Sequence, residues 1–217
     1  MMRLGVMGGM FDPVHRGHLV VARAAVSALS LDRLHLVPCA APNHREGAAA
    51  SGAQRMAMLE LATASESDLV VDDRELRRTG VSYSVDTLRD FHQQFADAAL
   101  VFVLGWDSFL TLPRWHRWQE LFSYAHLCTV SRPGVAWPPA MDDTDGRALR
   151  KLLTQRSVPD AQALFERTAG RVLVVENIEQ DISSTKVRRA LREGQSTGEW
   201  IDPAVTEYIA RHGLYCN

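Results

Sequence analysis

The chain of 217 residues is long enough to bury one substantial hydrophobic core, and we expect a single domain over residues 1–217. Its 24 lysines and arginines nearly balance 26 aspartates and glutamates, and a net charge of −2 gives no overall field that would attract nucleic acid. No apolar run is long enough to predict a membrane-spanning helix.

The first forty residues alternate between strand and helix. Residues 4–7 are apolar enough for a buried strand, and apolar positions recur at helical spacing from Leu19 to Leu29, in a helix that we expect to begin near His18. A second strand is predicted over residues 33–38. This order predicts a βαβ unit with parallel strands and a right-handed crossover, and ligands of such sheets bind beyond the carboxyl ends of the strands.

The turn between the first strand and this helix has the features of an anion site. Gly8 and Gly9 let a phosphate approach the backbone without a Cβ atom in the way, and the N-terminus of a helix favours negative charge. His15 and His18 lie three residues apart, where both rings can face one anion. A zinc site would lack a third ligand nearby, and the dinucleotide and Walker glycine patterns are absent. Taken singly, a Gly-Gly turn or one histidine has an ordinary structural explanation.

Small and helix-breaking residues at 39–52 predict a surface loop that carries His44 and Arg45, with a solvated linker as the alternative. A further helix and strand follow. Ser82 or Ser84 is the expected N-cap of the next helix, and capping alone explains a serine at that place.

The continuous apolar run at 100–104 predicts a central parallel strand that is buried on both faces. The strand ends at Gly105, which leaves room for a sugar or base, and the Asp107 carboxylate suits the hydroxyl groups of a ribose. The alternative is that Asp107 caps a short helix over residues 108–112.

The second half of the chain continues the alternation. Trp115 is a candidate to stack on a heteroaromatic ring, with core packing as the alternative. Strands are predicted at 125–130 and 171–176, and between them an exposed excursion at 135–146 precedes a helix at 147–156.

A second strand-to-helix turn carries hydroxyl and basic residues. Ser183, Ser184 and Thr185 precede Lys186 and Arg188 at the expected helix entrance. Simple capping is one explanation. Hydroxyl and N–H donors followed by a guanidinium also form a cradle for a polyphosphate, so the two turns together predict one triphosphate site. This motif opens a helical segment over residues 182–217, with a last helix at 203–211.

Cys39, Cys128 and Cys216 are odd in number and widely spaced, which argues against a disulfide framework and a structural zinc site. The first residues lack the succession typical of a signal peptide, so we expect a cytoplasmic protein. Neither a monomer nor a homo-oligomer is favoured by the sequence.

The motifs resemble those of a known family. The turn from Gly8 to His18 is similar to the Gly-Gly-Thr-Phe-Asp-Pro-x-His-x-Gly-His motif of the class I nucleotidyltransferases, with Met10 in place of the usual threonine. Other matching segments are Ser82-Tyr83-Ser84, Gly105-x-Asp107, Leu112-x-x-Trp115, Arg132-Pro133-Gly134 and the stretch from Ile182 to Arg188. Within that class the chain resembles the bacterial nicotinate-nucleotide adenylyltransferase family. The resemblance implies a Rossmann-like α/β fold, a doubly wound parallel sheet with flanking helices.

The resemblance also implies a reaction and a set of site residues. The reaction is transfer of AMP from ATP to nicotinate mononucleotide, giving deamido-NAD and pyrophosphate, with Mg²⁺ held mostly by the ATP phosphates and water rather than by protein ligands. The implied catalytic residues are His15, His18 and Arg188. The implied ATP-binding residues are Gly8, Gly9, Met10, Phe11, His15, His18, Gly105, Asp107, Ser183, Ser184, Thr185 and Arg188. The implied acceptor-binding residues are His44, Arg45, Ser84, Trp115, His116 and Arg132.

Two kinds of alternative stay open at the level of sequence. The same transfer chemistry serves other phosphate acceptors, such as nicotinamide mononucleotide, phosphopantetheine or glycerol phosphate. A non-catalytic nucleotide sensor would use the same pocket to regulate a partner.

The loss of a threonine hydroxyl at Met10 leaves the backbone N–H in place, so we expect retained activity with altered handling of ATP.

Overall fold

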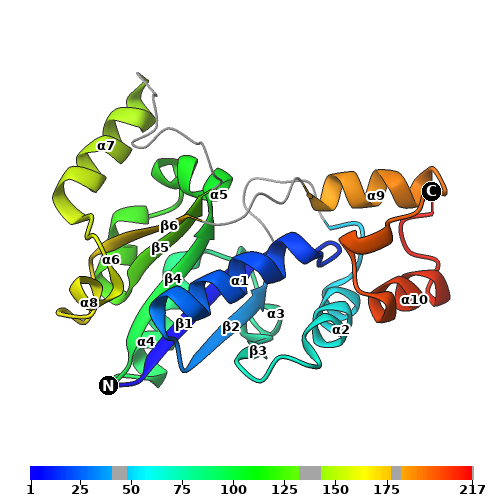
Figure 1. The fold of residues 1–217 in the computed structure, drawn as a ribbon, viewed down its shortest axis with the longest axis horizontal. Coiled ribbons are helices and arrows are strands. Elements are labelled where there is room, and N and C mark those ends of the chain that lie inside the picture. The colour runs from blue at the N-terminus through cyan, green and yellow to red at the C-terminus, as the bar shows by residue number, and fades with distance from the viewer. Residues whose placement is uncertain (41–47, 132–142, 177–181, 217) are drawn as a thin grey trace.

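The structure, a computed structural model, describes residues 1–40, 48–131, 143–176 and 182–216 (Figure 1). Six parallel strands form one sheet in the order β3-β2-β1-β4-β5-β6. The strands are β1 (Arg3–Gly9), β2 (Arg33–Pro38), β3 (Leu69–Val71), β4 (Ala99–Gly105), β5 (His126–Ser131) and β6 (Val172–Glu176). The predicted α/β fold with a doubly wound parallel sheet is confirmed, and the strand order reverses between β1 and β4.

Helices cover both faces of this sheet. They are α1 (Arg16–Leu29), α2 (Gly52–Thr63), α3 (Arg74–Arg77), α4 (Ser84–Gln94), α5 (Trp106–Leu110), α6 (Leu121–Tyr124), α7 (Thr144–Arg156), α8 (Ala161–Leu164), α9 (Ser184–Arg192) and α10 (Pro203–Arg211). Short 3₁₀ turns lie at Leu112–Arg114, Trp118–Glu120 and Gly198–Trp200. No helix in the described part of the chain combines the length and the apolar character needed to cross a bilayer.

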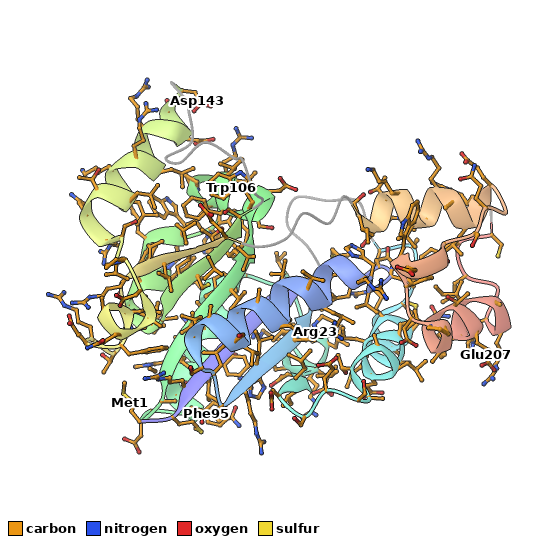
Figure 2. The ribbon with its side chains drawn as sticks, in the orientation of Figure 1. Met1, Arg23, Phe95, Trp106, Asp143 and Glu207 are labelled. Atoms are coloured by element: carbon orange, nitrogen blue, oxygen red, sulfur yellow. The ribbon has the colours of Figure 1, made fainter. Side chains whose placement is uncertain are left out.

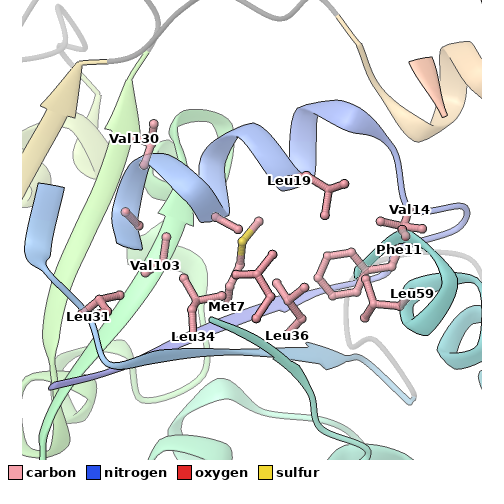
Figure 3. Close-up of a cluster of buried hydrophobic side chains, with 14 of the residues drawn as sticks. Met7, Phe11, Val14, Leu19, Leu31, Leu34, Leu36, Leu59, Val103 and Val130 are labelled. Atoms are coloured by element: carbon pink, nitrogen blue, oxygen red, sulfur yellow. The ribbon is translucent and has the colours of Figure 1, made fainter. Parts of the chain in front are cut away.

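The core consists of two layers, one on each face of the sheet. The layer under α1, α2, α9 and α10 takes Val101 and Val103 from β4, and the layer under α4 to α7 takes Leu100, Phe102 and Leu104. Because successive residues of a strand face opposite sides, this double burial explains why β4 is continuously apolar. Figure 3 shows part of the first layer, where Met7 of β1 packs among residues of β2 and α1.

Several helix starts differ from the prediction, each for a local reason. Helix α1 begins two residues before His18, because His15 is its extended N-cap residue. Neither Ser82 nor Ser84 caps α4: Tyr83 is the N-cap residue, and the Ser82 hydroxyl instead accepts from the Ala40 N–H at 3.3 Å. The capping alternative for Asp107 is also wrong, because Gly105 is the N-cap residue of α5.

The surface loop expected at 39–52 and the exposed excursion expected at 135–146 are described only in part. Residues 41–47 and 132–142 lie outside the described residues. Near the end of the expected loop Ala50 is buried, and helix α7 begins at Thr144, inside the expected excursion.

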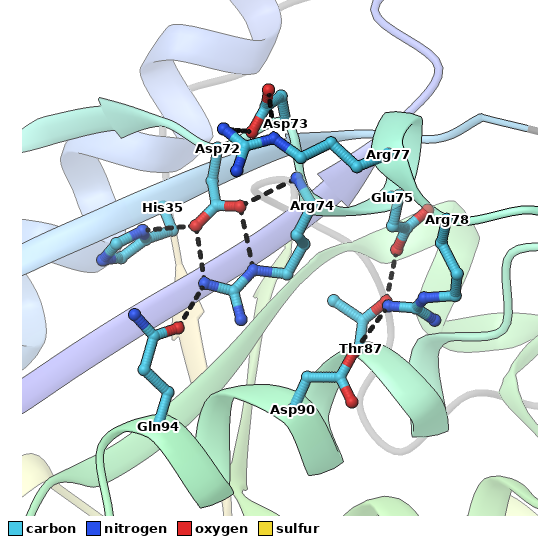
Figure 4. A network of polar contacts seen from close by, with 10 residues as sticks. All are labelled: His35, Asp72, Asp73, Arg74, Glu75, Arg77, Arg78, Thr87, Asp90 and Gln94. Carbon is cyan, nitrogen blue, oxygen red and sulfur yellow. Dashed lines mark hydrogen bonds and ion pairs between the residues drawn. The ribbon is translucent and has the colours of Figure 1, made fainter.

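A polar network ties the β2–β3 edge to α4 (Figure 4). Asp72 accepts two hydrogen bonds from the Arg74 guanidinium, at 2.8 and 2.7 Å, and lies 3.2 Å from His35 Nδ1. The guanidinium carbon of Arg74 lies 3.3 Å from the ring centroid of Phe91 in α4. Burial alone would raise the pKa of Asp72, but hydrogen bonds from His35 and Arg74 outweigh it and hold the pKa well below its usual range. This network joins the β3 edge of the sheet to α4.

His126 is a fully buried histidine with a structural role. Its Nδ1 accepts from the Arg171 N–H at 3.3 Å, and its Nε2 donates to the Arg167 carbonyl at 3.0 Å, so the ring is neutral. Burial lowers the pKa of His126 from 6.5 to about 4. Between these values the unfolded chain binds a proton that the folded chain does not, so stability is lost as the pH falls through this window.

We predict that the free energy of unfolding falls between pH 6.5 and pH 4, with His126 contributing on the order of 1 kcal/mol of the loss. Urea unfolding at pH 7 and pH 5 measures this. His126→Gln is expected to lower stability at pH 7 and to reduce the loss between the two pH values. An equal loss in the variant and the parent protein would contradict the assignment.

Candidate active site

A cavity of about 740 Å³ opens at the carboxyl ends of β1 and β4, where the strand order reverses. Figure 2 places Trp106, which follows β4 and lines this cavity, at the end of the sheet opposite Met1 and Phe95. Every residue predicted to bind ATP lines the cavity: Gly8, Gly9, Met10, Phe11, His15, His18, Gly105, Asp107, Ser183, Ser184, Thr185 and Arg188. The two strand-to-helix turns therefore face one shared space.

The two glycines of the first turn serve different purposes. A Cβ atom on Gly8 would meet nothing within 4 Å, so this position leaves the backbone open to the cavity. A Cβ atom on Gly9 would lie 2.9 Å from Cζ of Phe11. Phe11 is completely buried with a left-handed φ of 47°, and its ring meets that of His18 edge-on at 5.0 Å. Gly9 therefore makes room for the ring that supports the turn.

The two predicted imidazoles are stacked against each other. The ring centroids of His15 and His18 are 3.7 Å apart with 25° between the planes. Nδ1 of His18 accepts from the His15 N–H at 3.2 Å, so a neutral His18 carries its proton on Nε2, the nitrogen left to donate to an anion. A Cβ atom on Gly17 would lie 3.0 Å from Nδ1 of His15, which explains the glycine between the two histidines.

Burial keeps both rings uncharged at neutral pH. It lowers the pKa of His15 from 6.5 to about 4. Burial also lowers the pKa of His18 well below its usual value, and a positive charge on His15 would lower it further. Nδ1 of His15 is buried and has no hydrogen-bond partner in the described part of the chain. The pair is thus a set of neutral donors in a confined space rather than a pair of cations.

The second turn is joined to the first by direct hydrogen bonds. Ser183 caps α9 by accepting from the Lys186 N–H at 3.2 Å, so its capping role is real. The Ser184 hydroxyl donates to the Pro13 carbonyl at 3.0 Å, and Arg188 Nη1 donates to the Asp12 carbonyl at 2.6 Å. The entrance of α9 is therefore held against the first turn, residues 8–18, which we call the phosphate turn. The bonded residues lie more than 170 positions apart in the sequence.

The end of β4 forms the third side of the cavity. A Cβ atom on Gly105 would meet nothing within 4 Å, so its backbone is open as at Gly8. Asp107 is the second residue of α5 and lines the same cavity. An open glycine beside a carboxylate fits a nucleoside, because the carboxylate accepts hydrogen bonds from ribose hydroxyls.

The predicted acceptor-binding residues lie elsewhere, and none that is described lines this cavity. Ser84 is the first residue of α4, and the ring of the preceding Tyr83 is tilted against the His116 ring, with 4.2 Å between the centroids. Trp115 is half-buried, donates from Nε1 to the Thr111 hydroxyl at 3.3 Å and meets Phe102 edge-on. His44, Arg45 and Arg132 lie outside the described residues.

Three residues near the phosphate turn were not selected as site residues by the sequence analysis. Asp12 is buried beneath the turn and accepts from the Ala49 and Ala50 N–H groups at 2.8 and 3.1 Å. Arg55 of α2 is buried and donates to the Met10 carbonyl at 2.8 Å. Tyr215 donates to Asp12 at 2.7 Å. Asp12 stands within the motif from Gly8 to His18, whereas no sequence motif indicated Arg55 or Tyr215.

Comparison with known proteins assigns the family. Residues 6–190 match the cytidylyltransferase-like family. A probable nicotinate-nucleotide adenylyltransferase of Pseudomonas fluorescens is 43% identical over 214 residues, which cover 98% of this chain and 97% of the relative. A probable enzyme of the same name from Aeromonas salmonicida is 41% identical over 212 residues, covering 98% and 96%. The chain belongs to the nicotinate-nucleotide adenylyltransferase family.

Solved structures share the fold of this adenylyltransferase. A Plasmodium falciparum nicotinic acid mononucleotide adenylyltransferase complexed with APC matches with a TM-score of 0.72 at 16% identity, covering 99% of this chain and 98% of that one. The structure of the same protein complexed with NaAD matches with a TM-score of 0.71 at 15% identity and the same coverage. At this level of identity the likeness concerns the fold.

This adenylyltransferase departs from the phosphate-turn motif at Met10, where the motif has a threonine. Its carbonyl is held by Arg55 and the residue lines the cavity. The main chain at this position is therefore fixed without the threonine hydroxyl. Altered handling of ATP by this turn stays a prediction.

We predict opposite outcomes for alanine at the two glycines of the turn. Gly8→Ala adds a methyl group to the cavity without a clash in the protein, so ATP binding should weaken while stability is unchanged. Gly9→Ala forces its Cβ atom against Phe11 and should cost about 1–3 kcal/mol of stability. Thermal unfolding and calorimetric titration with ATP separate the two effects. Normal ATP affinity in Gly8→Ala would contradict the placement of the triphosphate.

Proposed function

We propose that this protein transfers the adenylyl group of ATP to nicotinate mononucleotide, releasing pyrophosphate and forming deamido-NAD. The observation that carries the proposal is the shared cavity, on which two helix N-termini converge with imidazole, hydroxyl and guanidinium donors. The relatives named as probable nicotinate-nucleotide adenylyltransferases, and the Plasmodium falciparum enzyme complexed with APC and with NaAD, support the same reaction.

The transfer needs no nucleophilic side chain. The phosphate of the mononucleotide is already an anion at neutral pH, so it attacks the α-phosphorus of ATP without prior removal of a proton. A new O–P bond forms as the bond to the β-phosphate oxygen breaks, and pyrophosphate carries the negative charge away. The protein's task is to align two anions and to stabilise the charge as it moves.

The donors of the cavity suit this task. Nε2–H of His18 is fixed as a donor by the hydrogen bond at Nδ1, so it needs no reorientation as charge develops. We place the leaving pyrophosphate between the imidazoles and the α9 entrance, where Thr185 and Arg188 line the cavity. Neutral imidazoles favour the anionic transition state through hydrogen bonds, and Arg188 supplies the cationic charge.

We place the nicotinate part of the acceptor beside α4. Ser84 opens this helix, whose N-terminus favours a carboxylate, and His116 lies against the neighbouring Tyr83 ring. A carboxylate preference at this place distinguishes nicotinate from nicotinamide. Trp115 would stack on the pyridine ring, with His44, Arg45 and Arg132 assigned to the acceptor by motif alone.

We also propose that Mg²⁺ enters with the ATP phosphates. The described residues contain no group of three or more histidine, cysteine, aspartate or glutamate side chains placed to hold a metal ion. Asp12 and Asp107 are the carboxylates among the cavity residues, and Asp12 is already engaged by backbone N–H groups. This donor set fits an anion whose metal is held by phosphate and water. The ion would screen the charge of the leaving group.

A pyrophosphate-release assay with ATP, Mg²⁺ and each candidate acceptor tests the proposal. We expect fast release with nicotinate mononucleotide, at least tenfold slower release with nicotinamide mononucleotide, and none with phosphopantetheine or glycerol phosphate. Addition of EDTA should abolish release. Nucleotide binding without release for any acceptor would favour the non-catalytic sensor instead.

We predict that His18→Ala lowers kcat by roughly 10² to 10³ with a smaller effect on ATP affinity, because its donor acts mainly on the developing charge. Steady-state kinetics and calorimetric titration of ATP measure the two quantities. His126→Gln, a buried histidine remote from the cavity, is the matched control and should keep the normal kcat. Near-normal turnover of His18→Ala would remove His18 from the catalytic residues.

A further inference from the structure

The last turn of the chain returns to the phosphate turn. After α10, Gly213 and Tyr215 adopt left-handed φ values of 59° and 62°, and the Tyr215 hydroxyl donates to Oδ1 of Asp12 at 2.7 Å. A left-handed conformation is uncommon for a tyrosine, so the contact is made at some conformational cost. The Tyr215 ring packs against the core layer beneath α1.

Asp12 is the meeting point of several parts of the chain. Its carboxylate belongs to a residue that is only 4% exposed, and it accepts from the N–H groups of Ala49 and Ala50 and from Tyr215. Arg188 Nη1 donates to the main-chain carbonyl of Asp12 at 2.6 Å but lies 3.8 Å from carboxylate Oδ2. The guanidinium is therefore close to the carboxylate without forming a short ion pair with it.

A buried carboxylate normally draws a nearby cation into a short pair. Arg55, the other cation at this turn, donates to the Met10 carbonyl. Here three donors already compensate the charge of Asp12. The Tyr215 hydroxyl stays a donor, because burial and the hydrogen bond to Asp12 raise the pKa of Tyr215 far above its usual value. With its carboxylate so occupied, Asp12 holds Arg188 through the neutral carbonyl oxygen instead.

We infer that Tyr215 is a positioning residue that keeps the Arg188 guanidinium available to the triphosphate by hydrogen-bonding the Asp12 carboxylate that would otherwise pair with it. The inference rests on the proposed role of Arg188 at the phosphates. The C-terminal tail thereby contributes to the active site without lining the cavity.

Tyr215→Phe tests the inference, because it keeps the packed ring and removes only the hydroxyl. We expect Arg188 to close on Asp12, so that kcat/KM for ATP falls about tenfold, the size of effect expected for one charge-assisted hydrogen bond. The KM for nicotinate mononucleotide should not change. Tyr208→Phe, on the half-buried tyrosine of α10 whose ring lies 4.2 Å from His212, is the matched control and should keep the parent kinetics.

A double-mutant cycle with Arg188→Ala separates positioning from simple anchoring of the tail. If Tyr215 acts through Arg188, Tyr215→Phe has no further effect on kcat/KM for ATP in the Arg188→Ala background. Assays are run below the melting temperature of each variant, which thermal unfolding provides. If Tyr215 had only a structural role, Tyr215→Phe would lower the melting temperature and leave the ATP kinetics unchanged.

Each outcome has a definite consequence. Normal kinetics of Tyr215→Phe beside impaired Arg188→Ala would overturn the inference and leave the proposed function intact. Independent, additive losses in the double variant would also overturn it. Normal ATP kinetics of Arg188→Ala would instead overturn the assignment of Arg188 in the proposed function.

Discussion

The active site depends on one junction, where the entrance of α9 is hydrogen-bonded to the main chain of the phosphate turn. Arg188 donates to the Asp12 carbonyl and Ser184 to the Pro13 carbonyl, so two helix N-termini from opposite ends of the chain converge on one cavity. Each N-terminus alone is a common feature of proteins. Their convergence confines the donors to a space that suits a triphosphate, in which a low dielectric strengthens each interaction.

Among the described residues that line this cavity, the histidines are neutral donors and Arg188 carries a positive charge. Burial keeps His15 and His18 uncharged, and the His15 N–H fixes which nitrogen of His18 donates. Arg188 supplies the positive charge. It donates to the Asp12 carbonyl and lies 3.8 Å from the Asp12 carboxylate. A site of this kind binds anions without neutralising them in advance, which suits a reaction whose product carries charge away.

Much of the fold was predictable because the sheet imposes its own pattern. The expected ends of β2 and α10 match the structure, and the run at residues 100–104 is the centre of β4, buried on both faces. The residues that line the cavity were predictable because they stand in short local motifs. Helix starts were less so: Tyr83 and Gly105 hold N-cap positions through backbone conformation without a capping side chain.

The sequence by itself determined the parallel sheet and the donors of the two phosphate turns, since both are written in the spacing of neighbouring residues. Only the tertiary structure decided which distant groups meet. No local pattern in the sequence indicates the burial of Asp12 and Arg55 or the stacking of the imidazoles. The same is true of the hydrogen bond between Tyr215 and Asp12, which spans 203 residues. They arise because packing α2, α9 and the last turn against the end of β1 places polar groups where they must pair with one another.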